Sequence, residues 1–169
     1  TYTGETSVSE GGLTLAAGGV IAGRVRNAAD FVNAGTVTGR VINLADFAST
    51  GTVQGGLTQF SGSSTLSGVV NGSISSAGTL IVNGNLTSND FAQTSGTGLT
   101  QILAGARWSG LTGLTHASTN STGLVIAGEL NVSGIVTTQT GATTIIGGGT
   151  GILTATNMAN LGTVTNNGT

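Results

Sequence analysis

Residues 27–42 read NAADFVNAGTVTGRVI, and residues 43–58 read NLADFASTGTVQGGLT. The two stretches repeat one unit at an offset of 16 residues, and eight of the positions are identical. The identical pairs are Asn27/Asn43, Ala29/Ala45, Asp30/Asp46, Phe31/Phe47, Gly35/Gly51, Thr36/Thr52, Val37/Val53 and Gly39/Gly55. A repeat of this kind indicates a supersecondary unit that stacks on its own neighbours.

The repeated unit alternates short β-prone runs with turn residues. Apolar and polar residues alternate within each run, as is typical of a half-buried strand. Glycine and asparagine separate the runs, and both accept the backbone conformations of tight turns. Strand and corner in alternation predict one coil of a solenoid, with equivalent residues about 4.8 Å apart in successive coils. We therefore expect an all-β fold, a right-handed parallel β-helix (β-solenoid) of about eight coils.

A β-sandwich is the alternative fold, because turn signals also recur at the spacing of hairpins. The constant offset of 16 residues favours stacked coils. Disorder is disfavoured, because 37% of the residues are hydrophobic and the net charge is only −2. The chain begins at Thr1 rather than at Met. We therefore expect residues 1–169 to be a single solenoid segment of a longer chain.

The repeat also predicts ladders of equivalent side chains along the stack. These pair Phe31 with Phe47, Val37 with Val53, Asp30 with Asp46, and Arg24 with Arg40. We expect the phenylalanine and valine ladders to fill the core. We expect the two aspartates to cap the backbone at a corner. The two arginines share the same offset of 16, so they are expected to neutralise the stacked carboxylates.

Segment 99–123, LTQILAGARWSGLTGLTHASTNSTG, departs most from the repeat. We expect an irregular coil or loop there, and loops that leave a regular scaffold often carry function. Arg107, Trp108 and His116 are therefore the candidate partner-binding residues. A tryptophan beside an arginine suits a sugar ring or a protein surface, although Trp108 filling a wider coil is the alternative.

The recurring elements G-T-V/L-x-x-G and N-G-x-L/I-x resemble those of a known class of secreted proteins. Gly78-Thr79-Leu80 and Gly162-Thr163-Val164 repeat the G-T-V/L part of the first element beyond residue 58. The chain is similar to the passenger domains of bacterial autotransporters and of filamentous-haemagglutinin-like secreted adhesins. The resemblance covers most of the chain and implies a right-handed parallel β-helix that is exported to the cell surface. The resemblance implies a fragment of a passenger domain and not a whole autotransporter, since we find no signal peptide and no C-terminal barrel in these residues.

Groups that carry chemistry are sparse in this sequence. His116 is the single histidine, and the acids nearest to it in sequence are Asp90 and Glu129, so no nucleophilic triad is evident. Asp30 and Asp46 would lie about 5 Å apart, which suits the carboxylate pair of a retaining glycosidase or a bound cation. Their structural role is the preferred interpretation. We therefore expect no enzyme activity, no catalytic residue, no cofactor and no metal.

The composition of the chain disfavours two classes of partner, nucleic acid and the membrane interior. Four arginines and no lysine do not form the basic patch that nucleic acid requires. No apolar run is long enough for a membrane helix, so we expect no membrane insertion by this segment. The expected function is a non-enzymatic structural or adhesive module of an extracellular or bacterial cell-surface protein. Its expected partner is a host or neighbouring-cell protein or glycan, or a second copy of itself. The alternatives are a self-assembling filament or surface-layer subunit, and a polysaccharide-acting β-helix enzyme.

Overall fold

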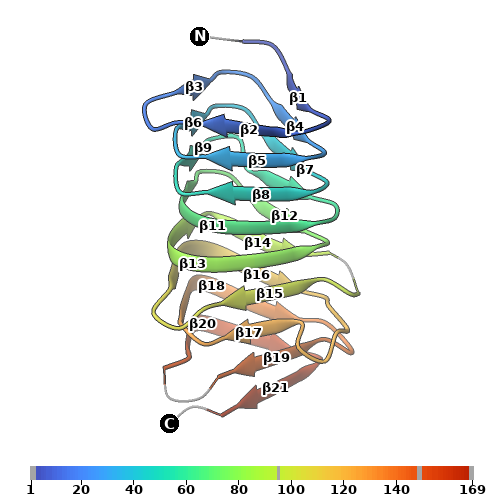
Figure 1. Cartoon of the computed structure of the whole chain (residues 1–169). Coiled ribbons are helices and arrows are strands. Elements are labelled where there is room, and N and C mark those ends of the chain that lie inside the picture. Colours follow the sequence, from blue (N-terminus) through green and yellow to red (C-terminus); the bar gives the residue numbers. More distant parts are fainter. Residues whose placement is uncertain (1–2, 95, 148–149, 168–169) are drawn as a thin grey trace.

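The computed structural model describes residues 3–94, 96–147 and 150–167. The described strands pair in parallel with strands one turn earlier and one turn later in the chain, except at the two ends of the stack, where each strand has one neighbour. They stack into a β-solenoid of about eight turns, with β1 (Thr6–Val8) at one end and β21 (Thr163–Asn166) at the other (Figure 1). This confirms the predicted parallel solenoid and excludes the β-sandwich, whose neighbouring strands pair in antiparallel hairpins. The described segments contain no helix with the length and apolarity to span a membrane.

Each turn of the solenoid contributes to three faces. The first face contains β1, β4 (Val25–Asn27), β7 (Val41–Asn43), β10 (Leu57–Gln59), β12 (Ile74–Ser76) and β14 (Asp90–Gln93). The second face contains β2 (Gly12–Leu15), β5 (Asp30–Asn33), β8 (Asp46–Ser49), β15 (Leu99–Ile102), β17 (Leu124–Ile126), β19 (Thr143–Ile146) and β21. The third face contains β3 (Val20–Ile21), β6 (Thr36–Val37) and β9 (Thr52–Val53).

Longer strands bend around a corner and belong to two faces. β11 (Ser63–Val70) and β13 (Thr79–Ser88) join the second face to the third. β16 (Arg107–His116), β18 (Glu129–Thr138) and β20 (Ile152–Asn160) join the third face to the first. The three faces therefore continue along the stack even where individual strands fuse.

The interior is built from ladders of identical or similar side chains. Phe31 lies in register with Phe47, and their rings stack with centroids 5.2 Å apart. Val37 lies in register with Val53, and both are fully buried. Alternate residues of each strand point inward, so one apolar row per face is enough to close the core. The repeat in the sequence is thus the repeat of these inward positions.

A buried polar row, here called the polar seam, runs inside the corner between the first and second faces. Its members occupy one register position in successive turns: Asn27, Asn43, Gln59, Ser76, Gln93, His116 and Thr138. Asn27 Nδ2 donates to Asn43 Oδ1 at 2.8 Å, and Ser76 Oγ donates to Gln59 Oε1 at 3.2 Å. Six of the seven side chains bond to one another or to corner carbonyls, which compensates for their burial, whereas Thr138 Oγ1 has no hydrogen-bond partner among the described residues.

Glycines occupy the corners where successive turns approach most closely. An added Cβ on Gly51 would overlap the carbonyl oxygen of Gly35, one turn earlier. An added Cβ on Gly39 would lie 2.5 Å from the carbonyl oxygen of Gly23 and 2.6 Å from Arg24 N. Backbone atoms of the previous turn thus fill the space that a side chain would need. This packing explains why the G-T-V-x-G element, Gly35 to Gly39 and Gly51 to Gly55, recurs with both of its glycines.

The irregularity expected over residues 99–123 lies in two connections and in a bend inside β16. β15 and the ten residues of β16 keep parallel pairing with both neighbouring turns. Residues 103–106 and 117–123 lie between strands. The departure from the 16-residue repeat therefore reflects longer corners and two register shifts inside β16, between Trp108 and Leu111 and between Leu111 and Gly113.

Candidate functional site

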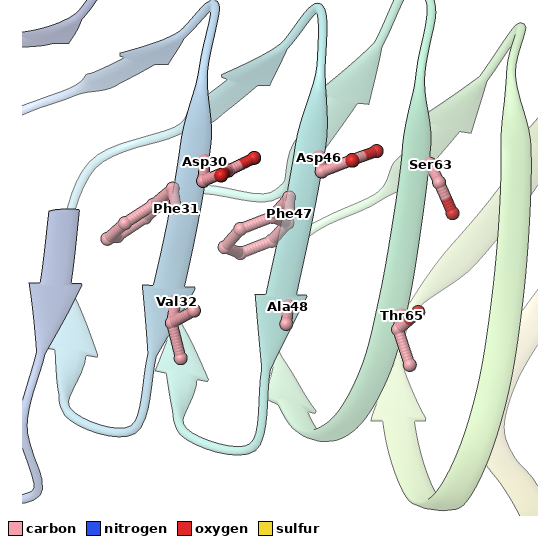
Figure 2. A pocket seen from close by; sticks show the side chains of 8 residues that line it. All are labelled: Asp30, Phe31, Val32, Asp46, Phe47, Ala48, Ser63 and Thr65. Atoms are coloured by element: carbon pink, nitrogen blue, oxygen red, sulfur yellow. The ribbon is translucent and has the colours of Figure 1, made fainter. Parts of the chain in front are cut away.

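The outer surface of the second face carries the most distinct cluster of exposed groups. Two outward rows run across β5, β8 and β11 (Figure 2). One row contains Asp30, Asp46 and Ser63, and the other contains Val32, Ala48 and Thr65. Between them lies an open groove of about 420 Å³, and Phe31 and Phe47 form its floor from the buried side.

Asp30 and Asp46 begin β5 and β8 and lie in direct register. Both are exposed. In the described ranges the ion pairs join Arg24 to Glu5 and Arg107 to Glu129, so neither aspartate has a basic partner. The predicted neutralisation by Arg24 and Arg40 is therefore wrong. The arginines lie next to each other, because they precede β4 and β7 on the first face, around a corner from the aspartates.

The capping role predicted for Asp30 and Asp46 belongs to asparagines. Asn33 Oδ1 accepts from Gly35 N at 3.1 Å, and Asn43 Nδ2 donates to Ala45 O at 2.7 Å. These amides point inward and both donate and accept, so they satisfy backbone groups at buried corners. Asn27 and Asn43 were visible as an identical pair in the repeat. The other members of the polar seam share a register position but are of four residue types, Gln, Ser, His and Thr.

The chemistry open to the Asp30–Asp46 pair follows from its surroundings. Neighbouring strands bring the two residues to about 4.8 Å, close to the spacing of a retaining glycosidase pair. Glycoside hydrolysis also needs one carboxyl kept protonated by a dry, apolar environment. Both groups here lie in an open groove. In the described parts of the chain, no three His, Cys, Asp or Glu residues come together as metal ligands.

Trp108 and His116 are core residues, which contradicts their predicted role in partner binding. Trp108 is 0% exposed, and its Nε1 donates to Ser88 Oγ at 2.8 Å. Its ring packs against Phe91 with centroids 4.9 Å apart. A bulky aromatic in a wider coil buries a large area while its N–H finds a partner. Of the three predicted binding residues, only Arg107 is exposed, and its Nε lies 3.6 Å from Glu129 Oε2.

His116 is the one titratable rung of the polar seam. Its Nδ1 lies 3.0 Å from Gln93 Oε1, and its Nε2 lies 2.9 Å from the carbonyl oxygen of Thr143. Burial lowers the pKa of His116 below its usual 6.5, and the bond to Thr143 opposes that effect in part. With Gln93 Oε1 facing His116, the Gln93 Nε2 atom has no hydrogen-bond partner among the described residues. If the Gln93 amide is rotated by 180°, its Nε2 takes the place of Oε1 and donates to Nδ1 of a neutral His116. The Nε2–H of His116 then donates to the carbonyl oxygen of Thr143.

The candidate residues thus divide into buried core residues and exposed residues of the faces. Rare groups that attract attention in the sequence, Trp108 and His116, are used inside the core. The exposed charges and small side chains of the faces remain available to partners. No protein-family model, curated protein sequence or solved structure matches this chain.

Proposed function

We propose that this chain is a non-enzymatic structural and adhesive module of a bacterial cell-surface or secreted repeat protein. It acts outside the cell as a stiff rod that presents its flat faces to a protein or glycan on another cell. This is the role that the resemblance to autotransporter and filamentous-haemagglutinin-like passengers implies. The observation that supports it best is the continuity of three outward faces along about eight turns.

The second face is the surface that we assign to adhesion. Its groove combines two carboxylates with the apolar side chains of Val32 and Ala48 and the hydroxyl of Thr65. Carboxylates accept bonds from sugar hydroxyls or basic side chains, while the small apolar groups allow close approach of a flat ligand. Val32 is 45% exposed, which is high for a residue in the middle of a strand.

The test uses beads coated with the isolated chain and incubated with host epithelial cells and with bacteria. We expect the coated beads to attach more than beads coated with albumin. Val32→Glu with Thr65→Glu should reduce attachment severalfold, whereas Thr36→Glu with Thr52→Glu on the third face should leave it unchanged. Attachment equal to that of albumin beads on both cell types would refute the adhesive role.

A polysaccharide-acting enzyme is the alternative, and the register of Asp30 with Asp46 is what favours it. The pair Asp30→Asn and Asp46→Asn separates the two functions. An enzyme of this class releases reducing sugar from a polysaccharide panel and loses that activity in the double variant. The proposed module releases none in either form, and release that depends on these carboxyls would overturn the proposal.

A further inference from the structure

Charge is divided between two neighbouring faces of the solenoid. Arg26 lies in the middle of β4, and Arg40 comes immediately before β7, so both belong to the first face. Both are exposed. The ion pairs of the described residues use Arg24 and Arg107 and leave Arg26 and Arg40 without a carboxylate. Arg40 Nε has a 3.5 Å contact with the carbonyl oxygen of Gly55.

The second face carries the opposite charge over the same two turns. Asp30 begins β5 and Asp46 begins β8, directly around the corner from β4 and β7. Arg26 and Asp30 therefore belong to one turn, and Arg40 and Asp46 belong to the next. Each cation has an anion at its own height on the adjacent face. The two lie on faces that point in different directions, and no ion pair between them occurs in the described ranges.

We propose that copies of this chain associate side by side in parallel, with the first face of one copy against the second face of the next. In that arrangement the two unpaired arginines of one copy meet the two unpaired aspartates of its neighbour at matching heights. The second copy thus supplies an oppositely charged partner for each of these residues, which within one chain lie on faces that point in different directions. An antiparallel arrangement would instead place these charges against the far end of the rod.

The remaining outward rows of both faces allow this contact. On the first face the row continues through small or half-buried side chains, namely Ile42, Thr58, Ser75 and Ala92. On the second face it continues through Ala48, Thr65, Ile81 and Gln101. These two rows carry no charge, so their burial leaves no ion unpaired, while the charged turns fix alignment. The first face also carries an acid, Asp90 at the start of β14, which accepts a hydrogen bond from Thr112 Oγ1 and lies three turns away from Arg40.

The contact joins two different faces, so it is heterologous. Each copy keeps a free first face on one side and a free second face on the other. Such contacts form rings or open bundles and do not stop at a dimer. This inference goes beyond the adhesive role, because it concerns copies of the chain and adds Arg26 and Arg40 of the first face. Both roles use Asp30 and Asp46 of the second face.

Sedimentation velocity over a range of concentrations tests the proposal. At about 10 mM salt the Debye length is near 30 Å, and at 100 mM it falls to about 10 Å. We expect species larger than a dimer at low salt and an association constant at least about tenfold weaker at 300 mM. Arg26→Gln with Arg40→Gln should weaken association by a similar factor. Thr36→Glu with Thr52→Glu changes the net charge equally on the third face and should have a much smaller effect.

Charge reversal gives the decisive comparison. Arg26→Glu with Arg40→Glu makes both faces acidic, and Asp30→Arg with Asp46→Arg makes both basic. Neither variant alone should associate, but an equimolar mixture should recover association, because each acidic face then meets a basic one. Circular dichroism confirms that each variant keeps its β-structure. A monomeric native chain at low salt, or a mixture that stays monomeric, overturns the proposal. Neither result changes the bead assay, so failure of self-association and failure of adhesion are distinguishable.

Discussion

Replacement of Gly39 by alanine tests whether backbone contact at the corners determines where glycine is required. The new Cβ would lie 2.5 Å from Gly23 O, 2.6 Å from Gly23 C and 2.6 Å from Arg24 N. Carbon and oxygen need a separation of well over 3 Å, so the turns must move apart by more than half an ångström. Rigid backbone atoms of the previous turn provide all three contacts, and no flexible side chain is available to yield.

The expected cost can be estimated from two opposing effects. Overpacking of a well-packed interior costs about 1–3 kcal/mol, and loss of parallel pairing at the same corner adds to it. Alanine also restricts the unfolded chain, which returns about 0.4–1 kcal/mol. We therefore expect Gly39→Ala to lower the free energy of unfolding by about 1–3 kcal/mol.

Gly12 supplies the matched control. A Cβ there would lie 3.7 Å from Asp30 Cβ, which is ordinary van der Waals contact. Gly12→Ala should be neutral or stabilising by a few tenths of a kcal/mol, since only the unfolded-state effect remains. Urea unfolding followed by far-ultraviolet circular dichroism measures both variants. Equal stability of Gly39→Ala and Gly12→Ala would refute the reasoning.

Three further predictions concern the core. Because burial lowers the pKa of His116 in the folded state, the unfolded chain binds a proton to this residue more readily. The contribution of His116 to the free energy of unfolding should therefore be complete above pH 6.5 and fall as the pH drops below it. Urea titrations at several pH values should show a weaker dependence of the unfolding free energy on pH for His116→Gln than for the native chain. Trp108→Phe should cost about 1–3 kcal/mol, since Ser88 loses its buried partner, and Trp108→Ala about 3–5 kcal/mol, as measured by urea unfolding. Asn43→Leu should cost about 2–4 kcal/mol, because Asn27 and the corner carbonyl of Ala45 lose hydrogen bonds, and a melting temperature equal to that of the native chain would contradict this.

The sequence predicted the architecture where the repeat is strict. Phe31 and Phe47 share an offset of 16 with several neighbours, so both the stacking and the inward direction of these rings could be inferred. The polar seam was not predicted beyond its asparagines. Gln59 and His116 share a position only once the lengths of the intervening corners are known, and those lengths vary along the chain. Hydrogen-bonding capacity is what the position requires, and several residue types supply it.

The errors about the site have a common physical origin. An offset of 16 shows that two residues stack, but it does not show to which face they belong. Asp30 and Arg40 were therefore expected to pair, although a corner separates them. Trp108 and His116 were interpreted as partner-binding because they are rare in this composition. Burial depends on the alternation within β16, where both residues occupy inward positions, and on partners that come from other turns.

The axial stacking of parallel turns also determines how the rod responds to force. The bonds between turns lie along the rod, so a pull on its two ends opens one turn at a time. A released turn of 16 residues, the length that separates Asn27 from Asn43, straightens to roughly 50 Å from a height of about 4.8 Å in the stack, and the longer turns nearer the C-terminal end straighten further. Each turn that opens therefore becomes about ten times longer than it was in the stack. In the proposed adhesive role, the load on a cell in flowing liquid would be spread over successive openings of single turns.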